Sequence, residues 1–565
     1  MARPRRPQPQ GSPLRRLTDL GHRLDPRAWT TSETLLAVAL LAVVIAPVTA
    51  AVQAIAHGWQ PSGDDATVAL RTAGILDGHL PVTGMRSTSG DGGHEDLSTH
   101  HLGPLQFYLL ALPLALTGGS AAGLALGGAL VAAAASVLSV VWARRLGGAL
   151  GVVVFAAGVL LTQWAIGGEA MFRPFNPYAP LLPTFLALLL LWGLARDDRR
   201  ALPPFVVALS LIAQSNLAFL PLAVALAALA IGLVLGPRLT RTRRRRHPQE
   251  RAAHRWALGL GVLVWLPSIV ELGIHSPHNL TLIIRWATAG TGDPIGLVAG
   301  IGHLDLIAPG PGGFRRNSPD LLTQGGELAT VVGIGILALL AAIATGYRVP
   351  RGRASSAWPA RVALVANLGM LATASRLPEW PLAPYWVITW LPVAAFTWCA
   401  LAWRALAYVD SATPHLPRRF ARPLGAALVG GGVAAAALAL PPAWAEYDSM
   451  TRVARAAGDD LGAGEGRHVR ISGLGFVPTL GASPAVAWQA HRQGWQPHYL
   501  TPWPFPEDAD HLWAGTAPEG TDTIYLTDSA EAELATDVPA TAREVAVLRM
   551  THREGDIGVY RDPGS

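Results

Sequence analysis

The chain contains no lysine: all 44 of its basic residues are arginines, although the chain is 565 residues long. This absence excludes a P-loop phosphate site, a Schiff-base lysine and a Ser-x-x-Lys nucleophile, because each of these needs the amine. The chain also has a single cysteine, Cys399, inside an apolar run. Internal disulfide bonds and cysteine-based metal sites are therefore excluded as well.

Hydrophobic residues, in contrast, make up 51% of the chain and gather in repeated runs long enough to cross a membrane. The first run follows a basic, proline-rich N-terminus (residues 1–33) and is too long for a secretory signal. We therefore expect it to be an uncleaved span. The formal charge of +6 comes from arginines between the runs, which orient the chain and do not indicate nucleic-acid binding.

The apolar runs predict an all-α polytopic membrane protein with about eleven transmembrane helices within residues 34–441. The predicted spans are residues 34–56, 120–142, 149–167, 178–195, 202–216, 218–236, 257–274, 328–346, 361–376, 385–403 and 424–441. Arginine-rich segments follow five of the spans, beginning at Arg144, Arg196, Arg238, Arg348 and Arg404. All five fall inside the cell if the N-terminus is cytoplasmic, as the positive-inside rule requires.

Two segments decide this topology. The apolar stretch from His101 to Leu116 is short for a span, and counting it as one would put Arg144 outside. We therefore predict a juxtamembrane or re-entrant helix there, on the outer face. Residues 202–236 are interpreted as two short spans that turn at residues 214–217, because a polar turn at membrane depth is tolerated where protein or water covers it.

This topology leaves an outer loop at residues 57–119 and a tail at residues 442–565 outside the cell, and the protein in the plasma membrane. The tail is mixed in composition and predicts a small extracytoplasmic α/β domain. Its predicted strands are His468–Ser472, Thr523–Thr527, Glu544–Met550 and Gly558–Arg561, with a helix at Pro484–Gln493.

Two adjacent carboxylates, Asp64 and Asp65, stand directly after the first span and before a short predicted helix at residues 66–74. Carboxylates favour helix N-termini, and Ser62 with Asp65 resembles a capping box, so both can be structural. The alternative is a general base, or a ligand of a base or metal, that faces a substrate at the outer surface.

Polar residues elsewhere in the outer loops are further candidates. His94, Glu95 and Asp96 have metal-ligand chemistry without zincin spacing, so a solvated loop is the simpler interpretation. His101 can donate to a lipid phosphate. In the loop at residues 168–178, an acid (Glu169) and a phosphate-binding cation (Arg173) can join Asp64, or the loop can simply begin a helix. At the membrane-depth turn, Gln214 and Asn216 either satisfy backbone groups or contact a sugar.

The order of these features resembles the GT-C superfamily of integral-membrane glycosyltransferases, which use polyprenyl-phosphate sugars. The resemblance covers about residues 30–240 and rests on Gly63-Asp64, the helix with Arg71, the run His101-Leu102-Gly103-Pro104 and Asn176-Pro177-Tyr178. More narrowly, the chain looks like an actinobacterial branch of dolichyl-phosphate-mannose mannosyltransferases and arabinofuranosyltransferases. It departs from that branch at Leu102, where proline is usual, and at Arg173, where an acid is usual.

The resemblance implies an inverting transfer of a hexose or pentose from a polyprenyl-phosphate donor to a cell-envelope glycan, lipid or protein on the outer face. Asp64 takes the position of the catalytic residue. Asp65 falls where the family usually has an apolar residue, and Glu169 lies four residues before the usual acid; both are assigned as supporting acids. The donor phosphate and sugar are assigned to five residues: Arg71, His101, Arg173, Asn176 and Gln214. No cofactor is assigned, and whether a divalent cation such as Mg²⁺ or Mn²⁺ takes part is left open.

Two other classes of function remain from the residues alone. A polysaccharide or lipid transporter or flippase would carry ionisable residues within its spans. The predicted spans of this chain are nearly free of charge, which disfavours this class. A non-catalytic, glycan-binding membrane scaffold is compatible with the departures at Leu102 and Arg173.

Overall fold

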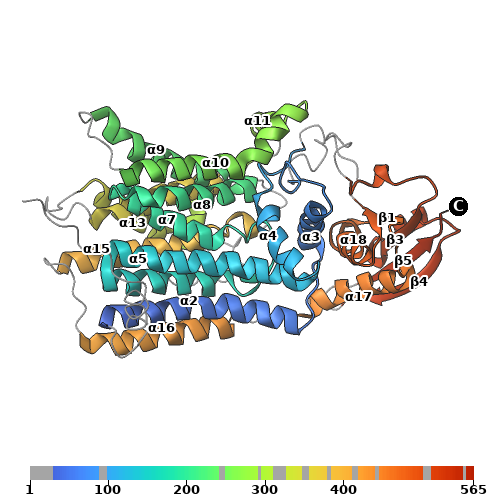
Figure 1. Cartoon of the computed structure of the whole chain (residues 1–565), viewed down its shortest axis with the longest axis horizontal. Coiled ribbons are helices and arrows are strands. Elements are labelled where there is room, and N and C mark those ends of the chain that lie inside the picture. Colours follow the sequence, from blue (N-terminus) through green and yellow to red (C-terminus); the bar gives the residue numbers. More distant parts are fainter. Residues whose placement is uncertain are drawn as a thin grey trace, which may run out of the picture.

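A helical bundle and a small five-stranded sheet form the two parts of the molecule, with the sheet at one end of the bundle (Figure 1). The computed structural model describes residues 30–87, 98–240, 248–289, 294–308, 326–346, 356–377, 384–409, 418–438, 444–499, 511–550 and 555–564. His94, Glu95 and Asp96 lie outside these residues.

Each of the eleven predicted spans overlaps a helix of the bundle, and one long helix covers two of them. The helices of this part are α2 (Thr31–Ala56), α3 (Gly63–Leu76), α4 (Leu105–Leu116), α5 (Ala121–Ile166), α6 (Glu169–Phe172), α7 (Leu181–Ala195), α8 (Leu202–Ser215), α9 (Leu220–Thr240), α10 (Pro248–Ile274), α11 (Asn279–Thr288), α12 (Gly296–Gly302), α13 (Glu327–Ala344), α14 (Trp358–Ala374), α15 (Trp390–Val409) and α16 (Arg418–Leu438). Short 3-10 turns are η3 (Arg199–Ala201), η4 (Leu217–Phe219), η5 (His303–Ile307) and η8 (Pro384–Trp386).

Six helices in the described part of the chain are long and apolar enough to cross a membrane. They are Ser32–Ala56, Ala121–Ile166, Leu217–Gly236, Pro248–Ile274, Glu327–Ala344 and Trp390–Ala407. The protein is therefore a multi-helix membrane protein, as expected, and the number of eleven crossings stays a prediction.

The 46-residue helix α5 is in fact a hairpin of two helices. Gly148 has φ 63° and ψ −150°, a backbone conformation that is open to glycine and to few other residues. The Gln163 amide lies 3.1 Å from the Ser136 hydroxyl, whereas 27 residues of straight helix would span about 40 Å. The two halves are therefore antiparallel, as the separate predicted spans 120–142 and 149–167 require.

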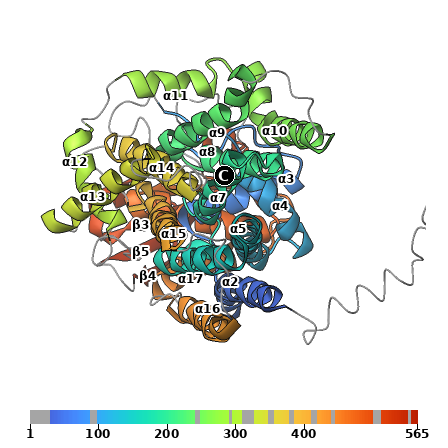
Figure 2. The same ribbon diagram turned by 90° about the vertical axis from the view of Figure 1, so that its left-hand side faces the viewer.

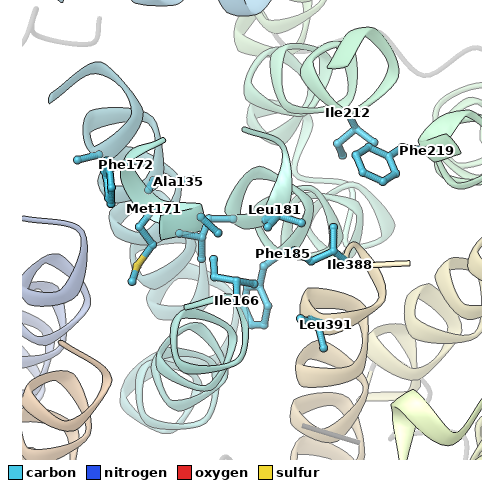
Figure 3. Close-up of a cluster of buried hydrophobic side chains, with 14 of the residues drawn as sticks. Ala135, Ile166, Met171, Phe172, Leu181, Phe185, Ile212, Phe219, Ile388 and Leu391 are labelled. Atoms are coloured by element: carbon cyan, nitrogen blue, oxygen red, sulfur yellow. The ribbon is translucent and has the colours of Figure 1, made fainter. Parts of the chain in front are cut away.

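The core of the bundle surrounds α7, which lies in the middle of the end-on view (Figure 2). Every residue from Leu181 to Leu194 is buried, so this helix contacts protein on all sides. Close to its start, Leu181 and Phe185 lie in a cluster of buried apolar side chains with Met171 and Ile166 (Figure 3). This cluster holds the short segment after α5 firmly against the bundle.

The predicted cytoplasmic loops meet at one end of the bundle. Arg145 forms an ion pair with Asp198, and Arg200 donates to Gln249 at 2.5 Å. These contacts bring together three of the arginine-rich segments. They agree with the prediction that these segments lie on the same side of the membrane. The outer segments meet at the opposite end, beside the sheet (Figure 1). Which end faces the cytoplasm stays a prediction.

The C-terminal part is the predicted α/β domain. It contains α17 (Trp444–Leu461), β1 (His468–Leu474), the π-helical turn η9 (Pro478–Ala482), α18 (Ser483–Arg492), β2 (Gln496–His498), η11 (Ala514–Thr516), β3 (Asp522–Asp528), η12 (Ser529–Asp537), β4 (Arg543–Arg549) and β5 (Asp556–Asp562). The strand order is β2-β1-β3-β5-β4, with β1 parallel to β2 and β3, and β5 antiparallel to β3 and β4. All four predicted strands and the predicted helix are confirmed.

Helix α3 lies between the two parts, packed against α4 on one side and α18 on the other (Figure 1). The Tyr499 hydroxyl donates to Thr67 of α3 at 2.9 Å, and Arg492 donates to Gln60 at 3.3 Å. Gly63 begins α3 with φ 53°, and a Cβ there would lie 3.3 Å from the Leu480 carbonyl. The C-terminal domain therefore rests directly on the helix that carries the two adjacent carboxylates.

Candidate functional site

The two carboxylates at the start of α3 have different surroundings. Asp64 is exposed on one side, whereas Asp65 is fully buried, with 0% of its surface exposed. The predicted capping box is wrong: Ser62 makes no side-chain hydrogen bond to α3, and the Asp65 carboxylate points elsewhere. Both acids still lie in the first turn of α3, where the positive end of the helix dipole favours them.

Arg173 joins Asp65 to the second outer loop. Its Nε donates to Asp65 Oδ2 at 2.6 Å, and its Nη1 donates to Glu169 Oε2 at 2.9 Å. The guanidinium also lies over the rings of Phe175 and Tyr178, each 5.7 Å from its centroid. The loop residues that the sequence placed near Asp64 therefore do meet the start of α3, and Arg173 is the link.

The segment that carries Glu169 and Arg173 is fixed by its apolar residues. Met171 and Phe172 of α6 are each 1% exposed, and Phe172 packs edge-on against Trp59 at 5.4 Å between ring centroids. A Cβ on Gly128 of α5 would collide with the Phe172 carbonyl oxygen. Glycine at this position thus lets α5 lie against the backbone of α6.

Desolvation by the surrounding protein dominates the electrostatics of the two aspartates, although one side of Asp64 is open to solvent. The pKa of Asp64 is raised to about 6: desolvation and the neighbouring Asp65 charge raise it, and Arg173 opposes both. Burial also raises the pKa of Asp65, although the charge and hydrogen bond of Arg173 lower it. One guanidinium thus faces three carboxylates.

His101 is buried and held as a neutral imidazole. The backbone N–H of Leu217 donates to its Nδ1 at 3.3 Å, which leaves the ring proton on Nε2. Burial lowers the pKa of His101 to about 3. A neutral Nε2–H can donate a hydrogen bond to an oxygen, but this side chain does not supply a positive charge.

Asn176 and Gln214 use their amides on the backbone. Asn176 donates to the Ser215 carbonyl at 2.9 Å. Gln214 accepts from Leu105 N–H at 3.2 Å and donates to the Val264 carbonyl at 3.0 Å. Asn176 thus satisfies the last carbonyl of α8, whereas Gln214 binds the start of α4 and a carbonyl of α10. The partners of Gln214 are backbone groups, as its structural alternative expected. The assignment of both residues to donor binding gains no support from them.

Arg71 lies two turns after Asp64, about 10 Å further along α3. Asp64, Thr67 and Arg71 follow the spacing of one helix face. Thr67 binds Tyr499 of the C-terminal domain, so this face is directed toward that domain. Arg71 therefore shares the face of Asp64 but stands further along the helix than the residues around Arg173.

A shallow apolar pocket, open on one side and with a cavity volume of about 20 Å³, ends at Arg173. Its walls come from α4, α5, α7, α8 and the second outer loop, and include Gln106, Leu109, Tyr178, Leu182 and Leu211. Leu112 and Leu116, on the same apolar helix as Leu109, are 66% and 78% exposed, which suits contact with lipid chains. The pocket thus combines apolar walls with a single cation.

Gln106 was not assigned a role from the sequence. Its amide donates to the Pro174 carbonyl, next to Arg173, and its side chain is 7% exposed. Apart from Tyr108 it is the one polar side chain in the first seven residues of the apolar helix α4, and this isolation could have identified it.

A metal site does not fit the described residues: none of their His, Cys, Asp and Glu side chains form a group of three placed to hold an ion. Glu169, the third acid near the aspartates, is instead bound to Arg173.

The comparisons with known proteins support the fold. No family model and no curated protein sequence matches the chain. Its structure is similar to that of ArnT from Cupriavidus metallidurans in the apo state, with a TM-score of 0.50 and 13% identity over 90% of this chain and 94% of that chain. ArnT bound to undecaprenyl phosphate gives a TM-score of 0.49 at 13% identity, covering 95% of this chain and 98% of that chain. Archaeal oligosaccharyltransferase AglB from Archaeoglobus fulgidus gives 0.38 at 12% identity, over 88% and 69%. The chain therefore shares the overall fold of ArnT.

The ion pair at the centre of the site can be tested by stability. In Arg173→Met, Asp65 is left buried without its cation, which costs about 3–5 kcal/mol at pH 8. Glu169→Gln removes a more exposed partner (30%) and costs at most about 1 kcal/mol. Because burial raises the pKa of both aspartates, they protonate readily in the folded protein, and the deficit of Arg173→Met shrinks at pH 5.

Thermal unfolding of the purified variants in detergent at pH 8 and pH 5 measures both effects. The central role of the Arg173–Asp65 ion pair is contradicted if Arg173→Met is no less stable than Glu169→Gln at pH 8. It is also contradicted if the loss of stability in Arg173→Met is larger at pH 5 than at pH 8.

Proposed function

We propose that the chain is an inverting glycosyltransferase that moves a sugar from a polyprenyl-phosphate donor to a cell-envelope acceptor on the outer face of the membrane. One observation carries this proposal: an apolar pocket ends at Arg173, whose guanidinium is bonded to the carboxylate next to Asp64. This arrangement would place the lipid tail of the donor in the apolar pocket and its phosphate at Arg173, near the base Asp64. The GT-C fold agrees with it, and undecaprenyl phosphate binds to ArnT.

Asp64 is the general base of the proposed reaction. Its carboxylate takes the proton of an acceptor hydroxyl while the hydroxyl oxygen attacks the anomeric carbon of the donor sugar. The bond from that carbon to the phosphate oxygen breaks, and polyprenyl phosphate leaves with the bonding electrons. Attack opposite to the leaving group inverts the anomeric configuration. Every one of these steps takes place with groups of the chain and its two substrates.

Arg173 stabilises the departing lipid phosphate. Its bond to the buried Asp65 is costly to break, whereas Glu169 is partly exposed and its pair with Arg173 is weak. The donor phosphate therefore replaces Glu169 on the guanidinium, and Asp65 keeps the guanidinium oriented. His101, whose Nδ1 accepts from Leu217, offers its Nε2–H as a neutral hydrogen-bond donor.

The narrower likeness to actinobacterial mannosyl- and arabinofuranosyltransferases stays a prediction, as do the sugar and the acceptor. The predicted orientation places the carboxylates and the C-terminal domain outside the cell, where lipid-linked donors of this kind make nucleotide binding unnecessary. The divalent cation left open by the sequence has no three-residue site in the described residues, and no step above depends on it.

Replacing the base tests the proposal. Asp64→Asn keeps the size of the side chain but cannot accept the proton, so transfer falls by about 10²–10⁴-fold. Asp65→Asn is the comparison variant: it leaves the base in place but weakens the hold on Arg173, so its loss of transfer is smaller than that of Asp64→Asn. The measurement is polyprenyl phosphate released by the purified full-length protein with labelled polyprenyl-phosphate hexoses and pentoses and a membrane-extract acceptor.

Retained activity in Asp64→Asn together with loss in Asp65→Asn would move the base to Asp65. Retained activity in both variants would remove the catalytic role of the pair altogether.

The pH dependence of transfer gives a second test. The base must be ionised, and its pKa is raised to about 6, so kcat/KM falls as the pH drops below about 6. Asp65→Asn removes a negative neighbour and moves this acid limb to lower pH. Glu169→Gln is the control and leaves the limb in place. An acid limb that Asp65→Asn leaves unmoved, or moves upward, contradicts the assignment of the limb to Asp64.

A further inference from the structure

A second pocket lies on the other side of α3, between the membrane part and the C-terminal domain. Its cavity volume is about 200 Å³, below the range of about 300–1,000 Å³ usual for drug-sized ligands, so it suits a small ligand. Its walls come from the loop before α3 (Gln60 and Pro61) and from α17 and α18 of the C-terminal domain. Nothing in the proposed donor site uses these residues.

Helical spacing brings the lining side chains to one place. Thr451, Ala454 and Arg455 are three and four residues apart on α17, and so share one face. Ala485, Trp488, Gln489 and Arg492 follow the same spacing on α18, whose face contacts that of α17. The small alanines leave room between the helices, and the longer polar side chains surround the opening.

The pocket is basic. Arg455 and Arg492 are exposed, and within the described residues neither forms an ion pair. Arg492 donates to the neutral Gln60, and Arg455 has no carboxylate within ion-pair distance in that part of the chain. Two guanidinium groups at one opening without counter-charges favour an anion.

The other lining groups suit a sugar. Trp488 is 1% exposed, and its indole N–H has no acceptor in the described residues, although a buried indole N–H usually has one. Gln60, Gln489 and Thr451 add amides and a hydroxyl that can bind sugar hydroxyls. An inorganic ion alone would leave most of these groups unused.

The pocket is close to the candidate base. Pro61 precedes Asp64 by three residues, so their Cα atoms are at most about 11 Å apart. This is about the length of two sugar units. The apolar pocket with Arg173 lies on the α4 side of α3, and this basic pocket lies on the α18 side.

We infer that this pocket binds an anionic carbohydrate, a sugar that carries a carboxylate or a phosphate, as part of the acceptor. The inference rests on the proposed transferase function only in calling this sugar the acceptor. The binding of an anionic sugar can be measured whether or not the protein transfers sugar. Arg455 and Arg492 hold the anionic group, and Trp488 and the two glutamines contact the sugar. The reacting hydroxyl then lies toward Asp64.

Calorimetric titration of the purified full-length protein in nanodiscs tests the binding. The probes are glucuronate, glucose 6-phosphate, neutral glucose and inorganic phosphate. We expect glucuronate or glucose 6-phosphate to bind at least tenfold more tightly than glucose and inorganic phosphate. The double variant Arg455→Gln with Arg492→Gln loses at least tenfold of that affinity, and Arg455→Lys with Arg492→Lys retains most of it.

The control variant is Arg285→Gln, which removes an exposed arginine of α11 and leaves the affinity unchanged. The inference is overturned if glucose binds as tightly as the charged sugars, if inorganic phosphate alone binds, or if no probe binds. It is also overturned if the double glutamine variant binds like the unmodified protein.

Asp64→Asn separates this inference from the proposed function, because that variant lacks the base but retains the pocket. Charged-sugar binding by a protein that never transfers sugar would leave the pocket assigned and the transferase function rejected. Transfer that depends on Asp64, without charged-sugar binding, would reject the pocket alone.

Discussion

The ion pair between Asp65 and Arg173 is the contact on which the arrangement of the site depends. It joins a fully buried carboxylate on α3 to the loop after α6, 108 residues further along the chain, with 2.6 Å between Nε and Oδ2. An unpaired carboxylate could not remain ionised at this depth. The pair therefore fixes where α3 begins, places Asp64 at the open edge of the protein, and holds the only cation of the apolar pocket beside it.

Helix α3 makes the site a junction of two environments. On one side it faces α4, whose exposed leucines and neighbouring pocket suit a lipid. On the other side it faces α18 and Tyr499 of a domain with a mixed sheet and a polar, basic pocket. The proposed transfer from a lipid-linked donor to an acceptor outside the membrane needs a base between these environments, and Asp64 is exposed at that position.

Much of this arrangement could be predicted from the sequence where the signal is local. The turn at Gln214 to Leu217, the short helix α4 and the four strands follow from apolar length, polar breaks and period, and all are confirmed. The three-residue strand β2 was missed because it is short and contains Pro497 at the edge of the sheet. The capping box considered for Asp65 was wrong because such a box is a local pattern, whereas the partner of Asp65, Arg173, is 108 residues away. Arg173 itself replaces an expected acid, and only the fold shows that its charge is shared between two acids near the apolar pocket.

The account rests on the lipid phosphate meeting Arg173 with its tail in the apolar pocket. A cryo-electron microscopy structure of the full chain in nanodiscs with polyprenyl phosphate tests this most directly. The account predicts phosphate density within hydrogen-bond distance of the Arg173 guanidinium, Glu169 moved away from it, and the tail along Leu109, Leu182 and Leu211. Phosphate density on another cation, or a tail that leaves this pocket empty, would contradict it.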